Sequence, residues 1–297
     1  MKKSGSVLVF GLALAMPFAQ AMAQGAGKVG GGVGAKGKAK APAAAAAPAK
    51  PKLGVALTAA QLELFRADLA SRELDKATAA ADALGKASGT ASSAAVVSIL
   101  LDQLALGTSP KLSMAILDAL SFHKSAAALE ALAHYARNRN DELRVKALYA
   151  IAATPDKAAV PLLMRALHDG AGSVRAVAAN ALAQRKELGA AETLMALLKR
   201  GDDSAASALG KLATPDLAAK LGDLIGDVRD DLLSNALGGL LMRDDLKDEV
   251  KLEVVRALGK IPGEMALAAL AEYIAQPVGK VKPPSRVEAE KILGERQ

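Results

Sequence analysis

The chain has 297 residues, enough for about two average domains, and carries 38 lysines and arginines against 31 aspartates and glutamates. It has no cysteine, which excludes disulfides, thiolate zinc sites, iron–sulfur clusters and a lipid-modified cysteine. The net charge of +7 is uneven, because residues 1–52 carry eight lysines and no acid. Residues 53–297 are therefore almost neutral, with 30 basic and 31 acidic side chains, which makes a nucleic-acid partner an unfavoured interpretation.

Residues 1–23 have the order of a secretory signal peptide. The start is basic, an apolar stretch follows over residues 7–16, and Ala21-Met22-Ala23 has the small-x-small pattern of a cleavage site. We expect cleavage between Ala23 and Gln24 and export to the periplasm or the medium. The alternative is an uncleaved anchor, for which the apolar stretch is short, since a bilayer needs about 20 residues. No later segment resembles a membrane span, so we expect none in the mature protein.

Residues 24–52 form a second compositional unit, rich in Gly, Ala, Pro and Lys and without acids or aromatics. Such a segment cannot bury enough apolar surface to order itself, which predicts a disordered tether. Its six lysines favour weak contacts with anionic envelope polymers, and a plain solvated spacer is the alternative.

Residues 53–297 have Ala and Leu at helical spacing and no alternating stretch typical of a strand. Short runs of Gly, Pro, Asp or Asn separate the predicted helices. An Ala-Leu-small pattern recurs, and its first six copies lie 36, 31, 31, 27 and 28 residues apart, which corresponds to one helix pair per step, at Leu84, Leu120, Ile151, Leu182, Leu209 and Leu237.

The next step, from Leu237 to Leu258, is only 21 residues and predicts an irregular or inserted helix around residues 228–247. Two Thr-Pro-Asp segments, at 154–156 and 214–216, predict helix starts, with Thr as the N-cap and Pro in the first turn.

Four segments begin with a hydrophobic residue and then Arg or Lys, followed by Ala and Leu. They start at Leu143, Val174, Val228 and Val250. With the acid in the preceding turn, this pattern resembles the second helix of HEAT repeats, and the resemblance covers nearly all of residues 58–297. It implies an all-α fold, a right-handed superhelix of about seven helix pairs. We expect the basic residues to pair with acids of their own or the adjacent repeat, in a structural ladder of Asp141, Arg144, Asp169, Arg175, Asp227, Arg229, Asp248 and Lys251.

In solenoids the second helices line one face, the concave face of the array. The residue two places before each anchor is polar or amphipathic in all eight copies: Asp82, Asp118, Tyr149, Asn180, Ser207, Asn235, Arg256 and Lys291. This column runs from acidic to basic and is our candidate partner-binding surface. In the similar armadillo solenoids, asparagines in a comparable row hold a peptide backbone. The alternative is a merely solvent-facing stripe.

No motif indicates catalysis. The three histidines, at 123, 134 and 168, lie in different repeats and form no metal-ligand pattern, and no nucleophile elbow or phosphate-binding loop occurs. We expect no metal and no cofactor. Paired aspartates fall at helix starts, where they complement the helix dipole.

The sequence thus predicts an exported, non-enzymatic scaffold or adaptor that binds a protein or peptide. One alternative is an envelope structural element held by its Lys-rich tether. Another is an enzyme resembling the HEAT-like phycobilin lyases or alkylpurine DNA glycosylases. A glycosylase needs a basic face with aromatics, and this array is neutral.

Overall fold

A computed structural model of the chain describes residues 54, 56–212, 214–277, 279 and 281–296. The predicted signal peptide, its cleavage site between Ala23 and Gln24, and the tether at 24–52 lie outside these residues. The chain divides into two units, 1–50 and 51–297, and the description below concerns the second.

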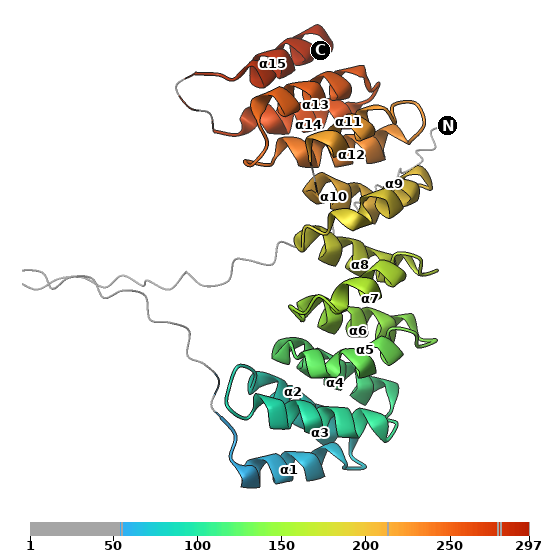
Figure 1. The fold of residues 1–297 in the computed structure, drawn as a ribbon, viewed down its shortest axis with the longest axis vertical. Coiled ribbons are helices and arrows are strands. Elements are labelled where there is room, and N and C mark those ends of the chain that lie inside the picture. Colours follow the sequence, from blue (N-terminus) through green and yellow to red (C-terminus); the bar gives the residue numbers. More distant parts are fainter. Residues whose placement is uncertain (1–53, 55, 213, 278, 280, 297) are drawn as a thin grey trace, which may run out of the picture. The chain divides into compact units, whose positions relative to one another are not determined.

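The described residues form fifteen α-helices and two short 3-10 helices, η1 (Ala126–Ala128) and η2 (Leu188–Ala190), and contain no β-strand. The helices stack in chain order as an all-α solenoid (Figure 1). The odd-numbered helices make a first row: α1 (Ala59–Leu69), α3 (Ser93–Ala105), α5 (Leu129–Tyr135), α7 (Ala159–Ala166), α9 (Ala191–Lys199), α11 (Pro215–Gly222), α13 (Asp248–Lys260) and α15 (Pro284–Arg296). The even-numbered helices make a second row: α2 (Leu74–Lys86), α4 (Pro110–His123), α6 (Asp141–Ala153), α8 (Gly172–Gln184), α10 (Asp203–Leu212), α12 (Asp230–Leu241) and α14 (Glu264–Ala275). Seven helix pairs and one further helix result.

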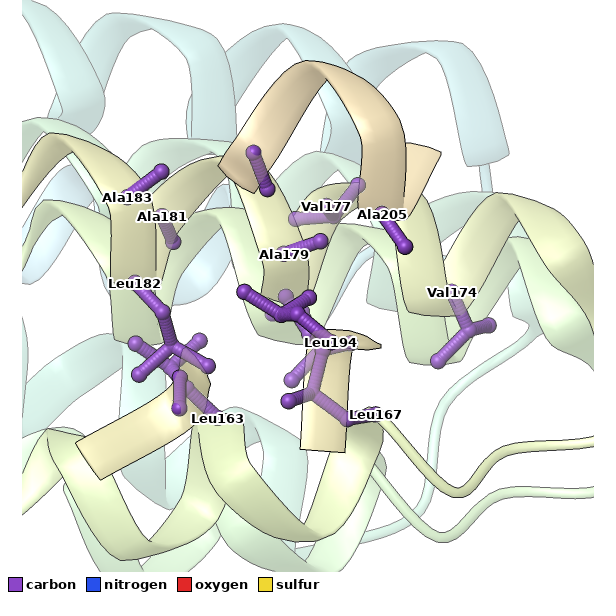
Figure 2. Close-up of a cluster of buried hydrophobic side chains, with 14 of the residues drawn as sticks. Leu163, Leu167, Val174, Val177, Ala179, Ala181, Leu182, Ala183, Leu194 and Ala205 are labelled. Atoms are coloured by element: carbon purple, nitrogen blue, oxygen red, sulfur yellow. The ribbon is translucent and has the colours of Figure 1, made fainter. Parts of the chain in front are cut away.

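Leucine and alanine make the core between the rows. In the middle of the array, Leu163 of α7 and Leu167, the residue that follows α7, lie in one cluster with Leu182 of α8 and Leu194 of α9 (Figure 2). All four side chains are completely buried. Burying one such side chain contributes about 2 kcal/mol, and since each helix pair shares these contacts with the next, the pairs are stable only as a stack.

Small residues let neighbouring helices of one row approach closely. The Gly that follows the anchor Leu in α10 is Gly210, and a Cβ placed on it would lie 2.9 Å from the carbonyl oxygen of Ala236 and 3.1 Å from Cα of Gly239, both in α12. Gly85 faces Ala119 of α4 in the same way. Gly85 and Gly210 are therefore packing residues.

The expected irregular helix around residues 228–247 is wrong. Leu237 lies in α12 of the second row, but Leu258 lies in α13, which packs against α11 and α15 of the first row. The 21-residue step thus leads from α12 to the next helix, α13, and the Ala-Leu-small pattern passes from the second row to the first. The pattern can occur in both rows because a buried Leu beside a small residue packs closely against a neighbouring helix in either one. Gly259 of α13 packs against Ile292 of α15, as Gly210 of α10 packs against α12.

The two Thr-Pro-Asp segments behave differently. Thr214 is the N-cap of α11, where its hydroxyl accepts a hydrogen bond from the Leu217 amide at 3.2 Å. Thr154 instead ends α6, because its buried hydroxyl donates to the Ala150 carbonyl at 3.0 Å, and α7 begins only at Ala159. The helix start predicted at 154–156 is therefore wrong by several residues.

Candidate functional site

The eight positions of the predicted column divide between the two rows. Six of them are exposed or half-buried on the second row, one on each helix from α2 to α12: Asp82, Asp118, Tyr149, Asn180, Ser207 and Asn235. Arg256 on α13 and Lys291 on α15 are exposed on the first row. The second row continues in α14, where the residue two places before the buried Leu270 is Ala268, which is exposed and apolar. The expected basic end of the column is therefore wrong, and the reason is the change of row at α13.

Two of the six second-row positions are already engaged by a lysine of the next helix in the row. Lys146 of α6 donates to both carboxylate oxygens of Asp118, at 2.8 and 2.7 Å. Lys211 of α10 donates to the side-chain oxygen of Asn180 at 2.7 Å. The charge of Asp118 is thereby balanced, and Asn180, whose oxygen already accepts one hydrogen bond, keeps both of its amide N–H groups for a ligand.

A hollow of about 360 Å³ lies between α6 and α8 on the second row. Tyr149, Ser173, Asn180 and Gln184 supply its polar side chains, and Val145 and Ala176 belong to its apolar lining. Tyr149 is 55% exposed, so its ring offers both an apolar face and a hydroxyl. Two residues of the predicted column, Tyr149 and Asn180, thus meet in this hollow.

Phe122, on α4, adds an apolar surface that the sequence interpretation did not single out. The residue is 61% exposed, and its ring lies against Gly85 of α2. Phe122 follows Asp118 by one helical turn. An aromatic residue four places after a column position is therefore the sequence feature that could have indicated this surface. An exposed phenylalanine and an exposed tyrosine on successive second-row helices are typical of interaction surfaces.

The predicted ladder has two rungs of matching geometry. Arg144 of α6 donates to both carboxylate oxygens of Asp169, in the turn before α8, at 3.0 and 2.9 Å. Arg175 of α8 donates through Nε to one carboxylate oxygen of Asp202, in the turn before α10, at 2.6 Å. Each guanidinium also donates to two carbonyls of the turn before its own helix. Asp202, read from the sequence only as a helix-start acid, is thus the acceptor of the second rung.

Electrostatics at the second rung favour the ionised carboxylate. Burial opposes the ionisation of Asp202, but hydrogen bonds from Ser204 and Arg175, together with the positive charge of Arg175, outweigh it and hold the pKa of Asp202 below its usual value. The pair is therefore a structural tie between turns.

The other ladder residues have different partners. Arg229 precedes α12 and pairs with Asp231 of that same helix, because it lies at the N-cap and not in the first turn as Arg144 does. Lys251 lies over the ring of Tyr273, 5.7 Å from its centre, and Asp248 accepts hydrogen bonds from the backbone and hydroxyl of Ser285. Asp141 and Asp227 are exposed, and neither makes an ion pair with a described residue. Arg229 thus reaches an acid of its own repeat, as expected, although that acid is not one of the predicted ladder residues. The ladder is wrong for Asp141, Asp227, Asp248 and Lys251, none of which makes an ion pair with a described residue.

A second set of ties, at the opposite helix ends, was not predicted. The basic residue at or just after the end of a helix donates to the last carbonyls of the preceding helix in its row. Arg185 reaches the carbonyls of Ala152 and Thr154 at 3.3 and 2.7 Å, and Arg296 reaches those of Gly259 and Ile261 at 3.3 and 2.9 Å. The sequence signal was a basic residue three places after an anchor Leu.

His123 makes the same tie in α4. Its Nε2 lies 3.0 Å from the Leu84 carbonyl and its Nδ1 2.6 Å from the Ser93 hydroxyl. Burial lowers the pKa of His123, against the hydrogen bond to Leu84, which raises it. The neutral imidazole that donates through Nε2 is therefore the form that fits, and the residue is structural.

Within the described residues, no group of three or more His, Asp or Glu side chains is placed to hold a metal ion. In the same part of the chain, no helix is both long enough and apolar enough to cross a membrane.

Comparison with known proteins places a family match in the middle of the array. A family model for HEAT repeats matches residues 135–206, which contain α6 to α9 and both ladder rungs. No curated protein matches the chain.

Several solved structures are similar at low identity. One is the complex of CpcE and CpcF of phycocyanin lyase from Nostoc sp. PCC7120, with 20% identity, 84% of this chain and 99% of that chain covered, and a TM-score of 0.43. Two are engineered proteins at 19% identity that cover 79% of this chain; 95% and 71% of their own chains are covered, with TM-scores of 0.34 and 0.42. Residues 135–206 are therefore similar to HEAT repeats, within a larger all-helical solenoid.

Proposed function

We propose that this protein is an exported scaffold without catalytic activity, whose second row of helices binds a protein or peptide. The observation that carries the proposal is the hollow between α6 and α8, where Tyr149 and Asn180 lie together beside apolar side chains. HEAT repeats, which residues 135–206 resemble, commonly serve as scaffolds for protein interactions.

The bound segment would cross α4, α6 and α8. Phe122 and Tyr149 supply apolar surface for its side chains, and aromatic groups of this kind often dominate the binding energy of an interface. Asn180 has its oxygen engaged by Lys211, so it would donate from its amide to a backbone carbonyl of the ligand. Because Arg256 and Lys291 lie on the first row, the charge order of the column no longer sets the direction of the ligand.

A peptide library displayed against the mature protein tests the binding surface. Peptides selected on the unaltered protein should bind Tyr149→Ala at least tenfold more weakly, because the ring fills the hollow, and Asn180→Ala about two- to tenfold more weakly, as for one neutral hydrogen bond. Leu188→Ala removes an exposed apolar side chain from η2 and serves as the control. Selected peptides that bind all three variants alike would exclude this surface.

Export rests on the residue order at positions 1–23. Amino-terminal sequencing of the mature protein should begin at Gln24. A cytoplasmic product that retains Met1 would contradict the proposed compartment and would bring the intracellular enzyme alternatives back.

A further inference from the structure

A second hollow, of about 470 Å³, lies between the first-row helices α5 and α7 and the turn that follows α7. Ala133, Leu162 and Ala166 belong to its apolar lining, and the cationic or titratable groups Arg137, Arg165 and His168 stand beside them. The volume matches a pocket for a small ligand of one or two amino-acid residues.

The charge of this hollow is positive because its only lining carboxylate is already engaged. Asp169 binds the Arg144 guanidinium through both oxygens and also accepts from the Ala171 amide at 2.8 Å. Arg137 and Arg165, by contrast, are exposed, and no described carboxylate lies within ion-pair distance of either.

Arg137 is also oriented by its own helix. Its Nε donates to the Ala133 carbonyl at 3.1 Å, which lays the guanidinium over the end of α5 and leaves its terminal N–H groups without a described acceptor. An anion held there would receive several charge-assisted hydrogen bonds at once.

The neighbouring hollow between α7 and α9 shows what distinguishes this one. Its Arg175 and Asp202 neutralise each other, so Arg200 is its single unpaired arginine among the described lining residues. The α5–α7 hollow therefore has two unpaired arginines beside its apolar wall, whereas the α7–α9 hollow has one.

We infer that the α5–α7 hollow binds a carboxylate attached to an apolar group, and specifically the carboxyl-terminal residue of a peptide that ends in an aliphatic side chain. The two guanidinium groups take the carboxylate, and the wall of Ala133, Leu162 and Ala166 takes the side chain. A bare phosphate would leave that wall uncovered. The site lies on the first row and uses none of the second-row residues of the proposed binding surface.

The probes are acetyl-Ala-Ala-Leu with a free carboxylate, the same peptide as its carboxamide, and inorganic phosphate, each titrated into the mature protein. Binding is measured by calorimetry and by the NMR shift of the His168 imidazole. We expect the free carboxylate to bind and the carboxamide to bind at least tenfold more weakly. Arg137→Gln and Arg165→Gln should each weaken binding about three- to tenfold, and the double variant should abolish it.

Arg200→Gln is the matched control, because it removes an exposed arginine of the next hollow and should leave the affinity unchanged. Tyr149→Ala should also bind the probe normally, which separates this site from the second-row surface. Equal binding of carboxylate and carboxamide would overturn the inference. So would phosphate binding at least as tight as that of the peptide, or an Arg137→Gln, Arg165→Gln double variant that keeps its affinity.

Discussion

Single basic residues tie successive helices together at both of their ends. Arg144 and Arg175 join the turns that precede second-row helices, whereas His123, Arg185 and Arg296 hold the carbonyls at helix ends. The sequence predicted the first set, because the hydrophobic-Arg pattern repeats. It did not predict the second, because a basic residue near a helix end is expected from the helix dipole alone and does not indicate which helix it contacts.

Arg175→Ala should destabilise the protein by about 2 kcal/mol. The substitution leaves Asp202 largely buried without its cationic partner and frees two carbonyls of the turn. Urea denaturation at pH 7 measures the effect. Arg229→Ala, which breaks an exposed pair within one helix, should leave the denaturation midpoint nearly unchanged. Equal losses in both variants would show that the ladder does not stabilise the array.

His123 should make stability depend on pH. Because burial lowers the pKa of His123, the folded state favours the neutral imidazole. Its contribution is therefore complete above the unfolded pKa of about 6.5 and is lost progressively as the pH falls below that value.

Thermal denaturation at pH 7, 6 and 5 should show a falling midpoint that is flatter in His123→Gln, which can still donate to the Leu84 carbonyl but does not titrate. His134→Gln alters an exposed imidazole and should keep the dependence of the unaltered protein. If His134→Gln flattened the pH dependence of the denaturation midpoint as much as His123→Gln does, the assignment of that dependence to His123 would be wrong.

At the scale of the helix, the sequence predicted the second-row elements well and the C-terminal ones less well. The spacing of anchors from Leu84 to Leu237 matches α2 to α12. Beyond that point the same pattern occurs in α13 and α15 of the other row. A pattern of one buried Leu and one small neighbour specifies a closely packed helix but not the row in which it packs.

Gly210→Ala tests the close approach of α10 and α12. An added Cβ would meet backbone atoms of α12, which cannot move as a side-chain tip can, so the variant should lose about 1 to 2 kcal/mol in spite of a better helix propensity. Gly294→Ala in α15 meets no atom within 4 Å and should be neutral or stabilising by up to about 1 kcal/mol. Chemical denaturation of both variants would reveal the opposite signs, and a stabilised Gly210→Ala would contradict the packing.

For the whole array, the C-terminal helix is fixed by a buried polar network. Arg286 is only 4% exposed; it donates to the carbonyls of Tyr273 and Gln276 and lies over the Tyr273 ring. The Tyr273 hydroxyl contacts Ser285, which in turn donates to Asp248. These contacts hold α15 against α13 and α14.

Arg286→Ala should lower stability by about 2 to 4 kcal/mol, since several hydrogen bonds and a ring contact are lost together. In a solenoid each repeat contacts only its neighbours, so faster hydrogen exchange should appear in α13 to α15 and not in α1 to α4. Lys291→Ala, on the exposed side of α15, is the control. Uniformly faster exchange along the whole chain would indicate that the array unfolds as one unit.

The change of row at α13 has a consequence for how repeats are numbered along this chain. Because the same short pattern packs in either row, it does not record the row to which a helix belongs. Repeats counted by this pattern therefore change row within one chain. An alignment of these repeats would have to follow helices one at a time.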